Sequence, residues 1–191
     1  MALDAGADFA GFVLYAPSPR AIAATNLVRL LDKLDAPARI VAVLVNESRA
    51  FAERLARDAA LRAVQLHGEE RSEDFLDFPV PVWRSVRFEN GRPNPDPALW
   101  QAERFVADAN VPGKRGGTGV TADWPAANRL ARQHPTMLAG GLTSANVGEA
   151  IRAARPMGVD TAGGVERAPG RKDPMAVRAF IRCARQTERK T

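Results

Sequence analysis

Short apolar runs recur along the chain with helical stretches between them, and this alternation constrains the possible folds more than any other feature. The run Ile40–Val45 is apolar at every position, as expected of a parallel strand that is covered on both faces. Strands that alternate with helices are typical of βαβ units and not of a β-sandwich. The sequence therefore predicts an α/β protein built on a parallel sheet.

Seven strands can be counted from these runs, with helices between them. The strands are expected near Phe9–Leu14, Ile40–Val45, Ala63–Leu66, Val82–Val86, Arg104–Asp108, Thr136–Ala139 and Val159–Thr161. The helices are expected near Ala24–Leu34, Arg49–Ala59, Ser72–Leu76, Trp124–Gln133, Asn146–Arg155 and Pro174–Gln186. Ser48 and Ser72 are placed to cap the second and third helices, and Asp173 with Pro174 to begin the last. The stretch 90–97 carries three prolines and is expected to be a loop.

Length and composition fit a single globular domain, 1–191. A chain of 191 residues with 46% hydrophobic and 26% charged residues is large enough for a substantial core, and no linker divides it. The 27 basic and 22 acidic residues give a net charge of +5, but the arginines are scattered through helices that also carry acids. Because a nucleic-acid binder concentrates its basic residues on one face or segment, nucleic acid is not expected as a partner.

Cysteine and histidine are too few for a disulfide framework or a metal centre. The chain has one cysteine and two histidines, and they form no cluster with the spacing of metal ligands. The absence of a long apolar span and of a charged-then-apolar leader argues against a membrane partner and for a cytoplasmic setting. The sequence does not indicate an oligomeric state.

Candidate chemistry lies in three glycine-rich stretches, 108–119, 138–142 and 158–166, each beginning within or at the end of an apolar run. Asp108 ends one run, and the pairs Gly140-Gly141 and Gly163-Gly164 follow two later ones. Glycine lets the backbone approach an anion closely, and successive free N–H groups supply hydrogen-bond donors. A carboxyl group beside two such turns is suited to protonate a substrate while its phosphate is held. Taken singly, each glycine pair is better explained as an ordinary turn, but three such signals in chain order are harder to dismiss.

Short motifs that occur in order over nearly the whole chain point to one family. They are Ala5–Phe12, Ser18–Arg20, Val43–Glu47, Val64–Gly68, Asp108–Gly113, Gly116–Gly119, Asp123-Trp124, Ala139–Thr143 with Asn146-Val147, and Pro169-Gly170 with Lys172-Asp173. In this order they resemble phosphoribosylanthranilate isomerase of tryptophan biosynthesis. The resemblance implies a (β/α)8 TIM barrel, a phosphorylated small-molecule substrate and no cofactor. The implied reaction is the Amadori rearrangement of N-(5-phosphoribosyl)anthranilate to 1-(2-carboxyphenylamino)-1-deoxyribulose 5-phosphate.

The resemblance also implies roles for individual residues. Asp108 is expected to be the general acid that protonates the furanose ring oxygen, and Arg20 to contact the anthranilate carboxylate. His67 and Asp160 are expected at the same mouth, where contact with the substrate and a purely structural role are equally open. Gly140, Gly141, Gly163 and Gly164 are expected to bind the phosphate. The family shows a Ser-Ser-Gly run after its last strand, whereas this chain has Ala162-Gly163-Gly164 and so lacks two hydroxyl donors.

The sequence departs from the family at its beginning. Family members begin with a strand that carries a Lys-Ile-Cys-Gly-type motif, whose cysteine is the general base. Here Met1 falls within what resembles the first helix, and the only cysteine, Cys183, lies in the last helical stretch. We therefore expect the barrel to lack its first strand and part of its first helix, and isomerase activity to be impaired. Two alternatives stay open: an inactive barrel that binds a phosphorylated ligand, and another phosphate-binding barrel enzyme such as an epimerase.

Overall fold

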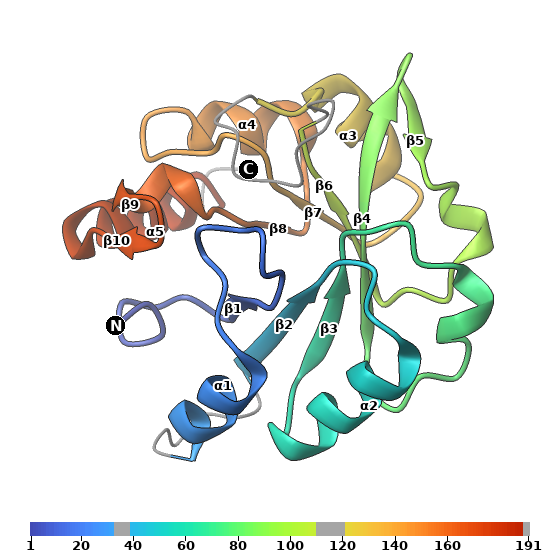
Figure 1. Cartoon of the computed structure of the whole chain (residues 1–191). Coiled ribbons are helices and arrows are strands. Elements are labelled where there is room, and N and C mark those ends of the chain that lie inside the picture. The colour runs from blue at the N-terminus through green and yellow to red at the C-terminus, as the bar shows by residue number, and fades with distance from the viewer. Residues whose placement is uncertain (33–38, 110–120, 189–191) are drawn as a thin grey trace. The chain divides into compact units, whose positions relative to one another are not determined.

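The computed structural model describes residues 1–32, 39–109 and 121–188 (Figure 1). Contacts divide the chain into two compact units, which are described separately. The first unit comprises Asp8–Arg84 and Leu99–Glu103, and the second comprises Met1–Ala7, Ser85–Ala98 and Arg104–Thr191. The expectation of one domain over 1–191 stays a prediction.

The first unit is a run of parallel strands with helices between them. Its elements are β1 (Ala10–Val13), α1 (Ala24–Leu31), β2 (Ile40–Leu44), α2 (Arg49–Asp58), β3 (Ala63–Leu66), the 3₁₀ helix η2 (Ser72–Phe75) and the first residues of β4 (Val82–Glu89). The strands pair in chain order, with Ala10 opposite Ile40, Val41 opposite Ala63 and Val64 opposite Val82. In Figure 1, α1 and α2 lie beside β2 and β3. The core of this unit includes Leu27, Ile40, Leu44, Val64 and Leu66, all fully buried.

The second unit continues the same parallel pattern. After β4 it contains β5 (Arg92–Asn94), part of the 3₁₀ turn η3 (Pro97–Leu99), β6 (Arg104–Ala107), α3 (Trp124–Ala131), β7 (Thr136–Leu138), α4 (Val147–Ala154) and β8 (Gly158–Val159). It ends with the 3₁₀ turn η4 (Gly163–Val165), a hairpin of β9 (Glu166–Ala168) and β10 (Arg171–Lys172), and α5 (Pro174–Glu188). Phe105 lies opposite Thr136, and Met137 opposite Gly158. The helix α4 packs against both α3 and α5.

The strands and helices expected from the sequence are confirmed to within a few residues, apart from Leu34, which lies outside the described residues. The stretch 90–97 differs from the expected loop, because β4 continues to Glu89 and turns back as an antiparallel hairpin with β5. Prolines at edge positions are compatible with such a short hairpin, since they remove no hydrogen bond from the central sheet. The β9–β10 hairpin was not predicted.

The predicted caps are confirmed at two helices and wrong at one. Ser48 Oγ accepts the Phe51 N–H at 3.2 Å at the start of α2. Asp173 Oδ1 accepts the Met175 N–H at 2.8 Å at the start of α5. Ser72 is the first residue inside η2, and the capping position belongs to Arg71, whose side chain makes no capping hydrogen bond. Because Ser72 lies inside the turn, its side chain is not at the position from which a cap accepts the first free N–H groups.

This difference predicts unequal effects of two serine substitutions. Ser48→Ala removes a side-chain acceptor from the first turn of α2 and should lower the free energy of unfolding by about 1 kcal/mol. Ser72→Ala removes no cap and should change it by less than about 0.5 kcal/mol. Chemical denaturation followed by circular dichroism would measure both. Equal losses in the two variants would contradict this assignment of the caps.

Candidate active site

Asp108 follows β6 directly and its carboxyl is buried in the second unit. Its backbone N–H donates to the Val86 carbonyl at 3.0 Å, and only 5% of the residue is exposed. Burial raises the pKa of the Asp108 carboxyl, while the Ala109 N–H donated to Oδ1 at 2.8 Å and the nearby Arg87 charge partly oppose this rise. A carboxyl whose neutral form is favoured is suited to donate a proton.

Asp160 follows β8 in the same unit, with its N–H donated to the Leu138 carbonyl at 2.8 Å. The pKa of its carboxyl is raised, first by desolvation among the surrounding protein atoms and then by the negative charge of Asp108. Lys172 and a backbone hydrogen bond from Thr161 oppose the rise. The residue also keeps an exposed surface, so solvent screens part of this shift. The charge of Asp108 therefore disfavours ionisation of Asp160.

The turn after β7 approaches Asp108 so closely that only glycine fits. Gly140 has a φ of +80°, and a Cβ there would lie 2.7 Å from the Ala109 nitrogen and 3.2 Å from Asp108 Oδ1. Gly141 also has a positive φ, +59°. Its carbonyl accepts Asn146 Nδ2 at 3.0 Å, and Asn146 Oδ1 accepts the Thr143 N–H at 2.8 Å. Asn146 thus fixes the turn that covers Asp108.

The turn after β8 lies against the turn after β7. A Cβ on Gly164 would overlap the Leu142 carbonyl oxygen, and Thr161 Oγ1 donates to the same oxygen at 2.7 Å. Gly163 and Gly164 begin η4 at this point. Leu142 therefore joins the two glycine turns, and both belong to the unit that holds Asp108 and Asp160.

Arg20 and His67 lie in the first unit. Arg20 is half-buried in the turn that follows β1, where its N–H donates to Ser18 Oγ at 3.2 Å. His67 follows β3, and its Nε2 lies 2.9 Å from Gln65 Oε1. The structure thus brings together Asp108, Asp160 and the four glycines. The approach of Arg20 and His67 to that group stays a prediction, and the motif 110–119 lies outside the described residues.

A buried ion pair next to His67 was not found from the sequence. Arg84 on β4 and Glu70 have side chains 3% and 2% exposed, with Arg84 Nη1 3.0 Å from Glu70 Oε2. The same guanidinium donates at 2.8 Å to the carbonyls of Leu66 and Gly68, on either side of His67. The sequence feature that could have revealed this ion pair is Arg84 itself, a charged residue inside the otherwise largely apolar run Val82–Val86.

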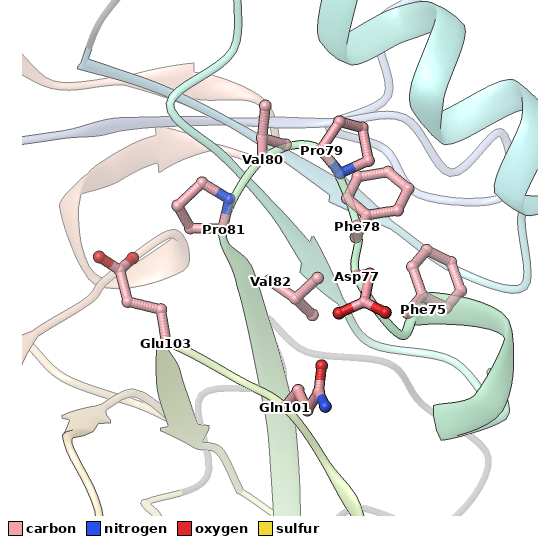
Figure 2. Close-up of a pocket in the computed structure, with 9 residues that line it drawn as sticks. All are labelled: Phe75, Asp77, Phe78, Pro79, Val80, Pro81, Val82, Gln101 and Glu103. Carbon is pink, nitrogen blue, oxygen red and sulfur yellow. The ribbon is translucent and has the colours of Figure 1, made fainter.

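A hollow of about 360 Å³ in the first unit holds none of the expected site residues. It lies at the beginning of β4, lined by Phe75, Phe78 and the segment 79–82, as Figure 2 shows. Glu103 on its rim already accepts hydrogen bonds from Arg62 Nη2 at 2.6 Å and Trp83 Nε1 at 2.8 Å. Because barrel enzymes place their chemistry at the carboxyl ends of strands, this hollow is not the candidate site.

The described residues show neither a metal-ligand cluster nor a membrane-spanning helix. In 1–32, 39–109 and 121–188, no group of three or more His, Cys, Asp and Glu side chains is arranged to hold a metal ion. No helix within those ranges is long and apolar enough to cross a membrane. Cys183 is partly exposed and lies on α5.

The raised pKa of Asp108 predicts how stability depends on pH. The folded state holds the Asp108 proton more tightly than the unfolded state, whose pKa is near the ordinary 3.8. This contribution to stability is fully present below that value and is lost as pH rises through the folded-state pKa. Asp108→Asn, which keeps the shape and is never charged, should therefore raise the free energy of unfolding at pH 7 but not at pH 3. Denaturant melts at both pH values would test this, and a loss of stability at pH 7 would contradict it.

Comparisons with known proteins agree on one family. The family model described as "N-(5'phosphoribosyl)anthranilate (PRA) isomerase" matches residues 1–183. The N-(5'-phosphoribosyl)anthranilate isomerase of Pelobacter propionicus is 36% identical over 98% of this chain and 90% of its own length. The N-(5'-phosphoribosyl)anthranilate isomerase of Roseiflexus sp. strain RS-1 is 41% identical over 96% of this chain and 90% of its own length.

A solved structure supports the same assignment. Phosphoribosyl anthranilate isomerase in complex with reduced 1-(o-carboxyphenylamino)-1-deoxyribulose 5-phosphate superposes with a TM-score of 0.79. It is 28% identical, over 97% of this chain and 91% of that one. The α/β barrel expected from the motifs is confirmed as the fold class. The chain belongs to the N-(5'-phosphoribosyl)anthranilate isomerase family.

Proposed function

We propose that this protein catalyses the Amadori rearrangement of N-(5'-phosphoribosyl)anthranilate to 1-(2-carboxyphenylamino)-1-deoxyribulose 5-phosphate, with Asp108 as the general acid. Membership of the isomerase family supports the reaction. The single observation that carries the proposal is the buried Asp108 carboxyl, with its raised pKa, beneath the Gly140 turn. The reaction belongs to tryptophan biosynthesis, and the proposal places it in the cytoplasm.

Asp108 performs the step that opens the sugar. Its carboxyl donates a proton to the furanose ring oxygen as the bond from that oxygen to C1 breaks. The nitrogen lone pair then forms a double bond to C1, which gives a protonated Schiff base. Removal of the C2 proton by a base yields an enol amine, and its tautomerisation to the ketone completes an isomerisation without an external oxidant or reductant. The base is assigned by resemblance to a cysteine on the family's first strand, and Cys183 on α5 does not occupy that place.

The phosphate is assigned to the turns that carry Gly140, Gly141, Gly163 and Gly164. Their side-by-side packing through the Leu142 carbonyl supports this assignment, because it brings backbone donors from two strand ends into one region. Successive backbone N–H groups that converge on one point form a concave site suited to an anion.

The other end of the substrate is assigned to Arg20. A guanidinium matches the geometry of a carboxylate with two parallel hydrogen bonds. Asp160 and His67 are proposed to contact the sugar hydroxyls between the two charged ends. The ion pair of Arg84 with Glu70 supports the role of His67, because it holds the carbonyls on both sides of that residue.

Binding of a phosphorylated ligand without turnover is the second candidate. The observation that favours it is that the single cysteine lies on the helix α5 and not in a strand or the turn after one. The same glycine turns would then hold the ligand, and Asp108 would have no proton to deliver. An epimerase is disfavoured, because metal-ligand histidines are expected there and the chain has two histidines.

Turnover by Asp108 variants tests the proposal. In the protein expressed from its own gene, Asp108→Asn should lower kcat for N-(5'-phosphoribosyl)anthranilate about a hundredfold or more, because a general acid contributes 10²–10⁴-fold. The matched control is Asp123→Asn, which keeps an amide oxygen at the α3 cap, where Asp123 Oδ1 accepts the Ala126 N–H at 2.9 Å. The control should retain kcat within about twofold.

The outcomes separate the two candidates. Activity of Asp108→Asn near that of the wild type would remove Asp108 from the mechanism. Tight binding of the product by a wild type that shows no turnover would favour the binding function instead.

A further inference from the structure

Lys172 holds the turn that carries Gly163. It lies on β10, after the turn in the chain, and its Nζ donates to the Ala162 carbonyl at 2.7 Å and to Glu166 Oε1 at 2.9 Å. The Glu166 side chain is 4% exposed, so its carboxylate is a fixed anchor and not a mobile surface group. Through these two bonds the β9–β10 hairpin is tied back to the segment that precedes it.

The bond to Ala162 sets the direction of the next amide. The only cis peptide bond in the described residues is Asn94–Pro95, so the bond between Ala162 and Gly163 is trans. In a trans peptide the C=O and N–H of one plane point in opposite directions. Because Lys172 draws the Ala162 carbonyl towards itself, the Gly163 N–H must point away from Lys172. Lys172 therefore decides which way one backbone donor faces.

Other contacts fix the two ends of the turn, which leaves the orientation of the Ala162–Gly163 peptide plane to be set by Lys172. At the start of the turn, Thr161 Oγ1 donates a hydrogen bond to the Leu142 carbonyl oxygen, and the Gly164 backbone packs against the same oxygen. At the end of η4, the Asp173 N–H donates to the Val165 carbonyl at 2.8 Å. With both ends held, the bond from Lys172 to the Ala162 carbonyl resists rotation of the Ala162–Gly163 plane.

We propose that Lys172 is a positioning residue for phosphate, which orients the Gly163 N–H towards the anion and is itself held in place by Glu166. The inference rests on the proposed function, because it names a group that makes the phosphate site effective. Lys172 acts through the backbone and is not assigned a contact with the reacting atoms. Its positive charge adds a favourable field for a phosphorylated ligand, but the directional effect on one amide is the specific claim.

Phosphate titration of matched variants tests the inference. Lys172→Met removes the hydrogen bond and the charge, and should raise the Kd for inorganic phosphate about tenfold, the equivalent of one charge-assisted hydrogen bond. Lys172→Arg keeps both and should stay within about threefold of the wild type. Arg171→Met is the control, because it removes the same charge from the exposed neighbouring position on β10 and should leave the Kd unchanged.

An amide signal separates orientation from simple charge. In ¹H–¹⁵N spectra, phosphate should shift the Gly163 amide of the wild type and of Arg171→Met, but not that of Lys172→Met. If Lys172→Met fails to fold, the double variant Lys172→Met/Glu166→Gln replaces it in the test. The second substitution removes the buried Glu166 carboxylate, which would otherwise be left without its cation. In steady-state assays the double variant should raise KM about tenfold with kcat within about twofold of the wild type.

The outcomes distinguish this inference from the proposed function. Equal phosphate affinity in wild type and Lys172→Met, or equal losses in Lys172→Met and Arg171→Met, overturns the positioning role alone. A wild type that turns over its substrate but shows no Gly163 shift with phosphate also overturns it alone. A wild type that neither binds phosphate nor turns over the substrate overturns both.

Discussion

The close approach of the β7 turn to Asp108 is the contact on which the environment of this carboxyl depends. Gly140 has no side chain, so the turn can lie against Ala109 and the Asp108 carboxyl. Its packing helps to exclude water from the carboxyl and so to raise its pKa. A buried carboxyl with a raised pKa costs stability at neutral pH, and the surrounding turns must supply enough packing to offset that cost.

The first unit buries an ion pair, Arg84 with Glu70. The Arg84 guanidinium is matched by Glu70, by two backbone carbonyls and by the Trp100 ring, whose centroid lies 4.6 Å from Cζ. Glu70 Oε1 in turn accepts the N–H of Asn46 at 2.8 Å and of Gly68 at 3.1 Å. Removing one partner of such a pair typically costs about 3–5 kcal/mol, because the other charge is left buried. The pair therefore fixes the loops after β2 and β3 together.

The sequence predicted the strands well because a parallel strand covered on both faces is apolar throughout, as at Ile40–Leu44. It also predicted Asp108 and Gly140 as candidates, since strand ends and glycine turns are local signals. It did not predict the two hairpins, whose strands have no more than three residues on at least one side. Nor did it single out Arg84, and it marked Lys172 only as part of the Lys172-Asp173 motif, without a role. The partners of these residues are set by tertiary packing, which no local pattern reveals.

In the proposed site, phosphate recognition would depend on peptide planes more than on side-chain hydroxyls. Ala162 and Gly163 stand where the family resemblance leads one to expect two serines, so two donors worth about 1 kcal/mol each are absent. A hydroxyl can rotate to meet an anion, but a backbone N–H points only where its peptide plane is held. The residues that hold these planes therefore gain importance as the hydroxyls are lost. Asn146 and Thr161 do so in the turn after β7, through the Gly141 and Leu142 carbonyls, and Lys172 does so after β8. Affinity in such a site is set by groups that need not touch the ligand.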